Sequence, residues 1–327
     1  MKAIVIKEHG GPEKLVLREL PDPQPKAGHV VIEVKAFGVN HAETHMRQGH
    51  WPEWTEVSGI ECAGVVKTDP EGKLRPGQTV VALMGGMGRT IYGSYAELTN
   101  VPRTNVVPIE TKLPWAALAA IPESYATAWS CLFGNLELQA GQTLVVRGAS
   151  SALGQAAVNI AVHAGARVLG TTRRRERFAS LEALGAAGTL LEGPGLAARL
   201  RQVRPGGVDA VLDLVGNSVV LESLTLVHRG GRVCEAGWLG GLEPIPAFNP
   251  ILQMPSGVHY SLFGSFVYGT PEFPLSDVPL QTIVDRVAAG AYKATPARVF
   301  RFEEIQEAHR LMESSQANGK LVVTLAA

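Results

Sequence analysis

The chain has 327 residues, of which 46% are hydrophobic and 18% are charged, and its 30 Lys and Arg balance its 30 Asp and Glu. That length allows two domains with a sizeable core. The zero net charge provides no overall electrostatic attraction for nucleic acid or an anionic membrane, so neither partner is expected. Three cysteines far apart in the sequence indicate a reducing, cytoplasmic compartment and exclude a four-cysteine zinc lobe. The N-terminus becomes polar too soon for a signal peptide, and no apolar run reaches the length of a membrane span.

The first 110 residues predict a β-rich fold with little helix. Short alternating or β-branched runs are separated by Gly, Pro and Asp, which are turn residues. The expected strands are AIVIKE, LVLREL, HVVIEVKAFGV, AGVVKT and QTVVAL. This pattern is typical of a sheet of many short strands folded over itself.

An Ala-rich run with helical period, residues 114–136, predicts a bridge into a second domain. Strand and helix patterns alternate from there on. The expected pairs are TLVVRG with helix 152–164, RVLGTT with helix 175–184, TLLEG with helix 195–203 and VDAVLDLVG with helix 217–228, followed by the strands GRVCEAG and HYSLFGSF. Because such apolar strands joined by helices form parallel sheets covered on both faces, the sequence predicts an α/β, doubly wound Rossmann sheet.

After Gly269 the patterns predict a helix, a strand, a second helix and a final strand, KLVVTL. The expected bounds are Leu280–Ala289, Ala297–Phe302 and Ile305–Ser314 for the first three. Since the doubly wound sheet already has six strands, we expect this segment to return to the first domain. The predicted domains are therefore 1–120 with 269–327, which is β-rich, and 121–268, which binds a nucleotide.

The turn that ends TLVVRGASSALG (residues 143–154) is a candidate dinucleotide site. A strand that turns sharply into a helix presents backbone N–H groups and a positive dipole end, which suit a pyrophosphate. The fingerprint is incomplete, because Gly148 and Gly154 remain while small residues replace the middle glycine. A plain strand–turn–helix is the alternative. The residues expected to bind the pyrophosphate are Ser150, Ser151, Ala152, Leu153 and Gly154.

The end of the next strand selects the dinucleotide. NAD-binding chains carry an acidic residue there for the ribose hydroxyls, whereas this chain has Thr172, Arg173 and Arg174, with Arg177 one turn later. Guanidinium groups match a phosphate, so we expect NADPH with its 2′-phosphate on these residues. A solvated basic helix start is the alternative.

Two later strands also end in glycine, where open α/β sheets bind ligands. The expected cofactor contacts are Leu214, Val215 and Gly216 at the first, and Ala236 and Gly237 at the second. A tight turn is the alternative for each glycine.

Motifs along the whole chain resemble the medium-chain dehydrogenase/reductase superfamily, in its zinc-independent quinone oxidoreductase (zeta-crystallin-like) branch. They are AFGVNHAETHMRQG (36–49), SGIECAGVV (58–66), GSYAE (93–97), ESYATAW (123–129), RGASSALG (147–154), VDAVLDLVG (208–216) and the terminal NGKLVVTL. The resemblance implies a GroES-like catalytic domain beside a Rossmann domain, with the cofactor lying across the cleft between them.

Zinc-dependent members of that superfamily carry a Cys and an Asp in the first motif and Gly-His-Glu in the second. This chain has Asn40 at the Cys position, Glu43 near the Asp position and Ile60 at the His position. Amide and aliphatic groups do not replace a thiolate and an imidazole as zinc ligands, so no metal is expected. The hydride acceptor must then already be electrophilic.

The resemblance further implies that Asn40 lies beside the nicotinamide, binding the cofactor, and that His45 and Trp51 stand where the family has a tyrosine pair lining the substrate cleft. His45 is a candidate proton donor to the reduced acceptor, and a hydrogen-bonded, partly exposed histidine is the alternative. Trp51 is a candidate stacking wall, with a core residue as its alternative.

Further cofactor contacts are implied by the same resemblance. Tyr125 and Thr127 match the pair that faces the nicotinamide ribose, although a buried tyrosine capping its helix is an alternative for Tyr125. Phe263, Gly264 and Lys320 are also expected to contact the cofactor.

The resemblance thus implies NADPH-dependent hydride transfer to a quinone, with reduction of an enone or a 2-enoyl thioester as an alternative. A second alternative, from another class, is an NADPH-binding structural or RNA-binding protein with little catalysis. HYSLFGSF falls where family members pair their sheets edge to edge, so a homodimer is expected.

Overall fold

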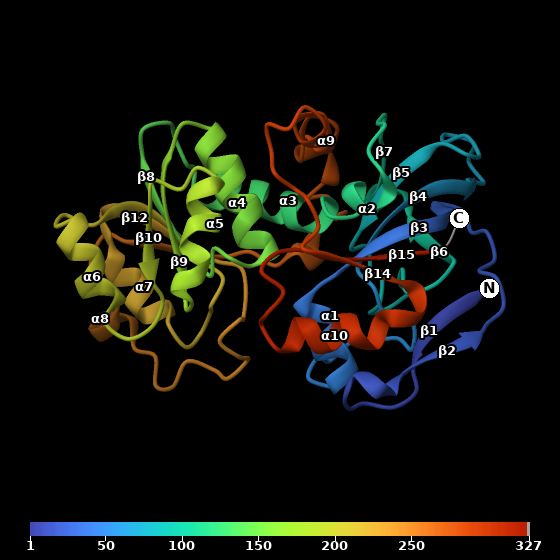
Figure 1. Cartoon of the computed structure of the whole chain (residues 1–327), viewed down its shortest axis with the longest axis horizontal. Coiled ribbons are helices and arrows are strands. Elements are labelled where there is room, and N and C mark those ends of the chain that lie inside the picture. The colour runs from blue at the N-terminus through green and yellow to red at the C-terminus, as the bar shows by residue number, and fades with distance from the viewer. Residues whose placement is uncertain (326–327) are drawn as a thin grey trace. The chain divides into compact units, whose positions relative to one another are not determined.

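The computed structural model describes residues 1–325, and the chain forms two compact units (Figure 1). Unit 1 combines Met1–Ala126 with the chain from Ser265 onward, and unit 2 is Thr127–Gly264. The first boundary falls inside helix α3 (Pro122–Trp129) rather than before it. The reason is that the first turn of α3 is bonded to unit 1: the Glu123 N–H donates to Glu61 Oε2 at 2.8 Å, and the Tyr268 hydroxyl donates to the Ala126 carbonyl at 2.6 Å.

Unit 2 is built on one parallel sheet of six strands in the order β10-β9-β8-β11-β12-β13. The strands are β8 (Thr143–Arg147), β9 (Arg167–Thr172), β10 (Gly188–Leu191), β11 (Val208–Asp213), β12 (Val227–Glu235) and β13 (His259–Leu262). The helices are α4 (Ala152–His163), α5 (Phe178–Ala183), α6 (Leu196–Val203), α7 (Val220–Leu226) and α8 (Pro250–Gln253). The order reverses next to β8, so the predicted doubly wound α/β class is confirmed.

Two expected helices differ from those in the structure. The helix expected over 217–228 is shorter in the structure, where it is limited to α7. Before α7, the Asp213 carboxylate accepts the Val215 and Gly216 N–H groups at 2.9 Å each and so extends the turn. After α7, β12 begins directly. The run 114–136 is divided into α2 (Trp115–Leu118), α3 and a π-helical segment (Ser130–Asn135). Pro122 has no N–H to continue a helix and instead begins the next one.

Unit 1 is β-rich, and the long strand β3 (His29–Val39) is its centre. The main sheet follows the order β14-β15-β3-β4-β5-β7, with β6 also paired to β3. The remaining strands of this sheet are β4 (Glu61–Thr68), β5 (Thr79–Leu83), β6 (Leu98–Pro102), β7 (Val106–Pro108), β14 (Arg298–Arg301) and β15 (Leu321–Thr324). β1 (Lys2–Ile6) pairs with β2 (Leu15–Glu19), and the helices of the C-terminal segment are α9 (Leu280–Ala288) and α10 (Ile305–Glu313).

Unit 1 also contains a helix that the sequence analysis did not predict, α1 (His41–Gln48). Asn40 caps its N-terminus in a capping box with Glu43, and Gly49 ends it with φ 77°. The Asn-x-x-Glu spacing followed by Gly is the local signal that could have indicated this helix.

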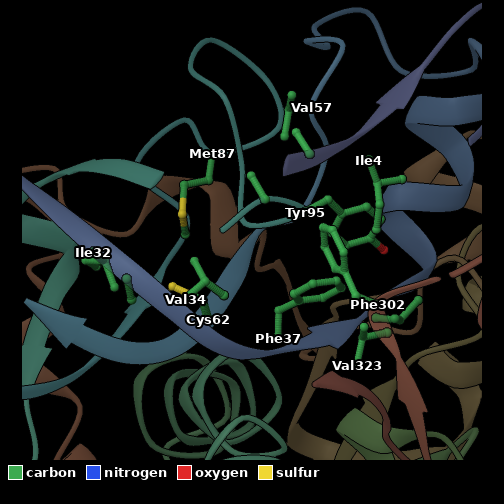
Figure 2. Packing of buried hydrophobic residues seen from close by; sticks show 14 of the residues in the cluster. Ile4, Ile32, Val34, Phe37, Val57, Cys62, Met87, Tyr95, Phe302 and Val323 are labelled. Carbon is green, nitrogen blue, oxygen red and sulfur yellow. The ribbon is translucent and has the colours of Figure 1, made fainter. Parts of the chain in front are cut away.

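The core of unit 1 joins segments from both ends of the chain. Figure 2 shows Phe37 of β3 between Tyr95 and Phe302, with ring centroids 4.6 and 6.3 Å away. Helix α10 packs on this core through Ile305, Ala308 and Met312, a spacing that places them on one face. Among residues 1–325, no helix has both the length and the apolar character needed to cross a bilayer.

His309, also on α10, is a fully buried polar residue. Arg47 Nε donates to His309 Nδ1 at 3.3 Å, so the ring proton is on Nε2, which lies 3.0 Å from the Tyr95 hydroxyl oxygen. Burial, with a smaller effect of Arg47, lowers the pKa of His309 from 6.5 to about 3.

We expect acid to destabilise the protein through this histidine. The folded state binds one proton fewer than the unfolded state between pH about 3 and 6.5, so stability is present above pH 6.5 and is lost as the pH falls, by about 2 kcal/mol at about pH 5. His309→Asn keeps an acceptor for Arg47 and should remove this loss. Urea unfolding of both proteins at neutral and acidic pH measures it, and a pH-independent difference between them would contradict the assignment.

Candidate cofactor and active-site residues

The turn between β8 and α4 approaches its own backbone closely. Gly148 has φ +76°, and a Cβ on Gly154 would lie 2.5 Å from the Gly148 carbonyl oxygen. Ser151 Oγ accepts the Gly154 N–H at 3.1 Å, so Ser151 caps α4. Ala152 and Leu153 are the first residues of α4. The incomplete fingerprint therefore still forms a tight turn at the start of a helix, and only glycine fits at position 154.

The turn is joined to the end of β9. Ser150 Oγ lies 3.2 Å from Thr172 Oγ1 and accepts a hydrogen bond from Arg177 Nη1 at 3.3 Å. Burial and the nearby guanidinium groups of Arg174 and Arg173 lower the pKa of Arg177. Within residues 1–325, the side chains of Arg173 and Arg174 have no hydrogen-bond or ion-pair partner. The structure thus collects three guanidinium groups beside the turn, two of them available to an anion.

The ends of β11 and β12 lie against each other. A Cβ on Gly237 would lie 2.8 Å from the Leu214 carbonyl oxygen, and one on Gly216 would lie 2.5 Å from the Gly237 carbonyl oxygen. The Ala236 N–H donates to the Asp213 carbonyl at 2.9 Å. The structure therefore brings these two predicted segments together. Phe263 and Gly264 follow β13 and are buried, with the Phe263 N–H donating to the Glu235 carbonyl at 2.9 Å.

A cavity of about 530 Å³ lies within unit 2. Its walls come from the connections that follow β10, β11 and β12, at the carboxyl edge of the sheet. The lining includes Gly193, Pro194, Asn217, Val219, Glu222 and Ile245. None of these was predicted as a site residue, because the cavity joins three loops that are far apart in the sequence.

Four polar residues form a buried cluster in unit 1. Lys320 Nζ donates to Asn40 Oδ1 at 2.5 Å and to Glu61 Oε1. Asn40 Nδ2 donates to Glu61 Oε1 at 3.0 Å and to Glu43 Oε1 at 3.3 Å. The two carboxylates and Lys320 are no more than 5% exposed. Asn40 and Lys320, both predicted as site residues, are therefore in direct contact, and Glu61 is the partner that the sequence analysis missed.

Glu43 is held by backbone donors as well. The N–H groups of Asn40 and Ile60 donate to its carboxylate at 2.6 and 3.2 Å. Burial nevertheless raises the pKa of Glu43 from 4.5 to about 7, against the opposing effect of Lys320. The cluster thus contains one ammonium group and two carboxyl groups, of which Glu43 titrates near neutral pH.

This donor set does not fit the catalytic zinc of the superfamily. The amide of Asn40 and the aliphatic Ile60 stand at two ligand positions, and the Lys320 ammonium group is bonded to the oxygens of Asn40 and Glu61. A cation at the centre of the cluster repels a metal ion, and an amide oxygen is a poor zinc ligand. Within residues 1–325, no three His, Cys, Asp or Glu side chains are placed to hold a metal ion.

His45 lies on α1, in the helix that Asn40 caps. It is half-buried, its Nδ1 is enclosed, and this atom has no hydrogen-bond partner in residues 1–325. Burial and the neighbouring His50 lower its pKa, so it is mainly neutral near pH 7 and carries one N–H. Trp51 follows in the next connection and is partly exposed.

Tyr125 is 3% exposed and stacks on Tyr292 at 5.7 Å between ring centroids. This packing favours the alternative in which Tyr125 supports α3. Thr127, two residues later, is also buried.

Known proteins support one family. The alcohol dehydrogenase GroES-like domain matches residues 26–111, and the zinc-binding dehydrogenase model matches residues 184–323. Human quinone oxidoreductase is 30% identical over 99% of this chain and 98% of its own length. A squalestatin tetraketide synthase of Cochliobolus lunatus is 28% identical over 90% of this chain, which spans only 12% of that synthase. A mycobacterial structure complexed with NADPH is 26% identical, with a TM-score of 0.87 over 99% of both chains.

The chain therefore belongs to the medium-chain dehydrogenase/reductase family, in the branch of the quinone oxidoreductases. It is an NAD(P)-dependent oxidoreductase with a GroES-like domain and a Rossmann domain. The resemblance described from the sequence motifs is confirmed.

Proposed function

We propose that this protein is a zinc-independent, NADPH-dependent oxidoreductase that transfers hydride to a quinone. The choice of NADPH depends on the guanidinium groups of Arg173 and Arg174, which follow the end of β9. Within residues 1–325 these two side chains have no hydrogen-bond or ion-pair partner. A 2′-phosphate would satisfy them, whereas an adenosine ribose without one would leave three like charges together. The lysine-centred cluster supports the absence of zinc.

In this proposal, the residues of unit 2 bind the cofactor and orient it. The backbone N–H groups of Ser150, Ala152 and Leu153 would hold the pyrophosphate at the start of α4, because the other N–H groups of the turn already donate within the protein. The cavity of about 530 Å³ would take the adenosine end. Bound NADPH supplies a hydride for an electrophilic acceptor.

The residues of unit 1 act on the acceptor and its surroundings. Lys320 and Glu61 fix the amide of Asn40 through hydrogen bonds on both of its polar atoms. His45 would take up a proton from solvent to form the imidazolium and pass it to the reduced acceptor, which returns the ring to its neutral form. Trp51 would form an apolar wall that excludes water.

Reduction of an activated alkene is the second candidate. The similarity that motivates it is the 28% identity between this chain and a segment of a squalestatin tetraketide synthase. The same hydride and proton positions serve a carbon–carbon double bond conjugated to a carbonyl.

One assay tests both candidates. The purified protein is mixed with NADPH and a panel of benzoquinones, naphthoquinones, enones and 2-enoyl thioesters, and the loss of reduced-nicotinamide absorbance is followed. Quinone turnover faster than alkene turnover supports the main proposal, and the reverse supports the second candidate. NADPH binding without turnover of any acceptor would contradict both and favour a structural or RNA-binding role.

The arginines at the end of β9 should set the cofactor preference. We expect R173A/R174A to raise the Kd of NADPH about 100-fold, since two charge-assisted contacts of roughly 1.5 kcal/mol each are lost. The Kd of NADH should change little. R229A is the matched control, because Arg229 is an exposed arginine of the same unit. Equal effects on the two cofactors would contradict the assignment.

We also propose that the protein is a homodimer in the cytoplasm. β13 is the last strand in the sheet order, so one edge is unpaired within the described chain. Leu262 on this strand is 52% exposed, and Ile251 and Leu252 on α8 are 91% and 80% exposed. Such an apolar edge suits a second copy of the same strand. Cys62, Cys131 and Cys234 are buried and form no disulfide, which supports a reducing compartment.

Light scattering tests the dimer. Leu262→Lys should give a monomer, while Val203→Lys, at a residue 56% exposed on α6, should leave the mass unchanged. A monomeric parent protein would contradict the proposal.

A further inference from the structure

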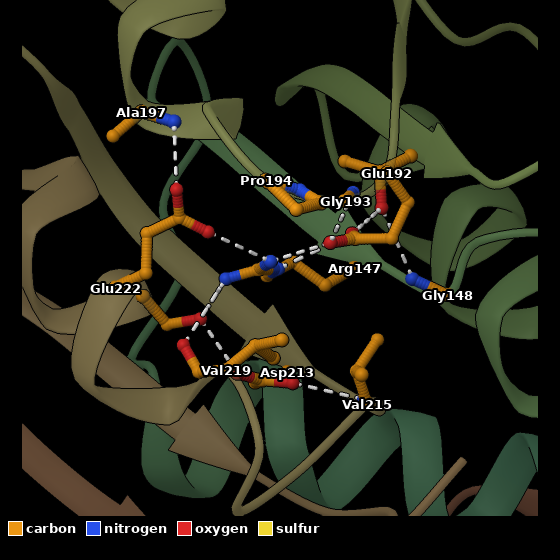
Figure 3. Close-up of polar contacts among 12 residues, drawn as sticks. Arg147, Gly148, Glu192, Gly193, Pro194, Ala197, Asp213, Val215, Val219 and Glu222 are labelled. Atoms are coloured by element: carbon orange, nitrogen blue, oxygen red, sulfur yellow. Dashed lines mark hydrogen bonds and ion pairs between the residues drawn. The ribbon is translucent and has the colours of Figure 1, made fainter. Parts of the chain in front are cut away.

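Arg147 is a fully buried charged residue that hydride transfer does not use. It is the last residue of β8 and directly precedes Gly148. Its guanidinium group binds Glu192 with two hydrogen bonds, from Nε to Oε2 at 3.2 Å and from Nη2 to Oε1, and Nη2 also reaches Glu222 Oε2 at 3.1 Å. Nη1 donates to Ser223 Oγ at 2.9 Å and to the Val219 carbonyl at 3.2 Å. Figure 3 shows Arg147 between Glu192 and Glu222.

The two carboxylates extend these contacts to both walls of the cavity. Glu192 Oε1 accepts the Gly193 N–H at 3.1 Å, and Gly193 lines the cavity. Glu222 of α7 also lines the cavity, and it accepts the Ala197 N–H of α6 at 3.2 Å. One guanidinium group therefore joins the connection after β10 to the beginnings of α6 and α7.

A second chain of hydrogen bonds leads from Arg147 to the glycine turn. Glu192 Oε2 accepts a hydrogen bond from Thr171 Oγ1 at 2.5 Å. Thr171 Oγ1 in turn accepts the Gly148 N–H at 3.2 Å, and its carbonyl accepts the Ala149 N–H at 2.9 Å. The first two N–H groups of the turn are thus oriented by a residue that Glu192 holds in place.

Arg147 also affects the site through its positive charge, which is surrounded by carboxyl groups. Ser223 Oγ also donates to Asp213 Oδ2 at 2.6 Å, so three carboxyl groups surround one guanidinium group. Burial raises the pKa of Asp213, and the hydrogen bond from Ser223 and the charge of Arg147 oppose this effect. Without Arg147, the remaining carboxylates would repel a diphosphate bound to the adjacent turn. A buried ion cluster of this kind is a poor source of stability in itself, which is consistent with a role in binding.

We propose that Arg147 is a positioning residue for the adenosine-diphosphate half of the cofactor, acting through Glu192 and Thr171. It holds the glycine turn and the two cavity walls in the geometry that binds the ligand, and it neutralises the carboxylates behind them. This inference rests on the proposed function only in that a phosphorylated dinucleotide binds unit 2.

The experiment compares two ligands on three variants of the full chain. NADPH contains both halves of the dinucleotide, and 2′,5′-ADP contains only the adenosine half. Arg147→Lys keeps a charge but loses the two-point contact, and Thr171→Val keeps the ion cluster but removes the hydroxyl that reaches Gly148. The matched control is Arg47→Lys, because Arg47 is also fully buried and ion-paired, to Glu313 in unit 1.

We expect R147K to raise the Kd of NADPH and of 2′,5′-ADP by the same factor, about tenfold, while kcat at saturating NADPH stays within about twofold. T171V should change both Kd values in the same direction. R47K should lower the Tm without changing either Kd. Calorimetry gives the Kd values, and thermal unfolding gives the Tm.

The outcomes separate this inference from the proposed function. A parent protein that binds 2′,5′-ADP, with the same Kd in R147K and T171V, would overturn the role of Arg147. A fall in kcat with unchanged Kd values would also overturn it. A parent protein that binds neither ligand would instead overturn the choice of NADPH. If R147K does not fold, T171V alone decides, because it alters no charge.

Discussion

Lys320→Met is expected to destabilise unit 1 by about 3–5 kcal/mol, because it leaves a buried carboxylate without its cation. Glu61 is 0% exposed and Lys320 is 5% exposed, and they form a direct ion pair. For a unit of this size, such a loss lowers the Tm by roughly 10 °C. The amide of Asn40 also loses the donor to its Oδ1, so we expect kcat to fall even at temperatures where the variant is folded.

A charge-matched control and a second-site change sharpen this test. Lys67→Met removes an exposed ammonium group that lies 3.2 Å from Asp22, and it should cost less than about 1 kcal/mol. Glu61→Gln in the Lys320→Met background removes the orphaned charge and should restore part of the lost stability. If the single variant were as stable as the parent protein, the cluster would not be a coupled ion pair.

Gly154→Ala is expected to raise the Kd of NADPH about 100-fold. The added methyl group pushes the backbone of the turn away from α4, so the N–H groups of the turn no longer point at the pyrophosphate. The new Cβ would lie 2.5 Å from the Gly148 oxygen and 2.6 Å from Ala149 Cα, and both of these atoms are backbone. Neither can rotate away as a side chain can. The overpacking itself should cost about 1–3 kcal/mol and leave unit 2 folded.

Gly134→Ala is the control for this substitution. Gly134 lies in the π-helical segment of the same unit, and a Cβ there meets no atom within 4 Å. Its Kd for NADPH should equal that of the parent protein, while circular dichroism reports whether each variant is folded. An unchanged Kd for Gly154→Ala would show that the turn does not contact the cofactor.

Most elements of unit 2 were predictable, since its strands and helices carry their own signals. Buried parallel strands such as TLVVR are continuous apolar runs, and the helices between them have a period of 3.6 residues. The glycine turn and the arginines after β9 were predictable for the same reason, as each is a short local pattern. In unit 1, helix α1 was missed because its apolar face is narrow, although the Asn40–Glu43 capping box marks its start.

The contacts that define the site were not predictable from such patterns. Glu61 and Lys320 are separated by 259 residues and meet only because β15 pairs with β3, which in turn pairs with β4. Arg147 reaches Glu192 and Glu222 from separate crossovers of the sheet.

The sequence by itself determined the class of fold and the positions of the glycine turn and its basic neighbours, because these depend on residues close together in the chain. Only the tertiary structure decided which charges pair, which cavity wall each loop forms and how Asn40 is held. Ion pairs between distant residues follow no sequence period and no fixed sequence spacing. They can therefore be recognised only once the strands that carry them are paired in register.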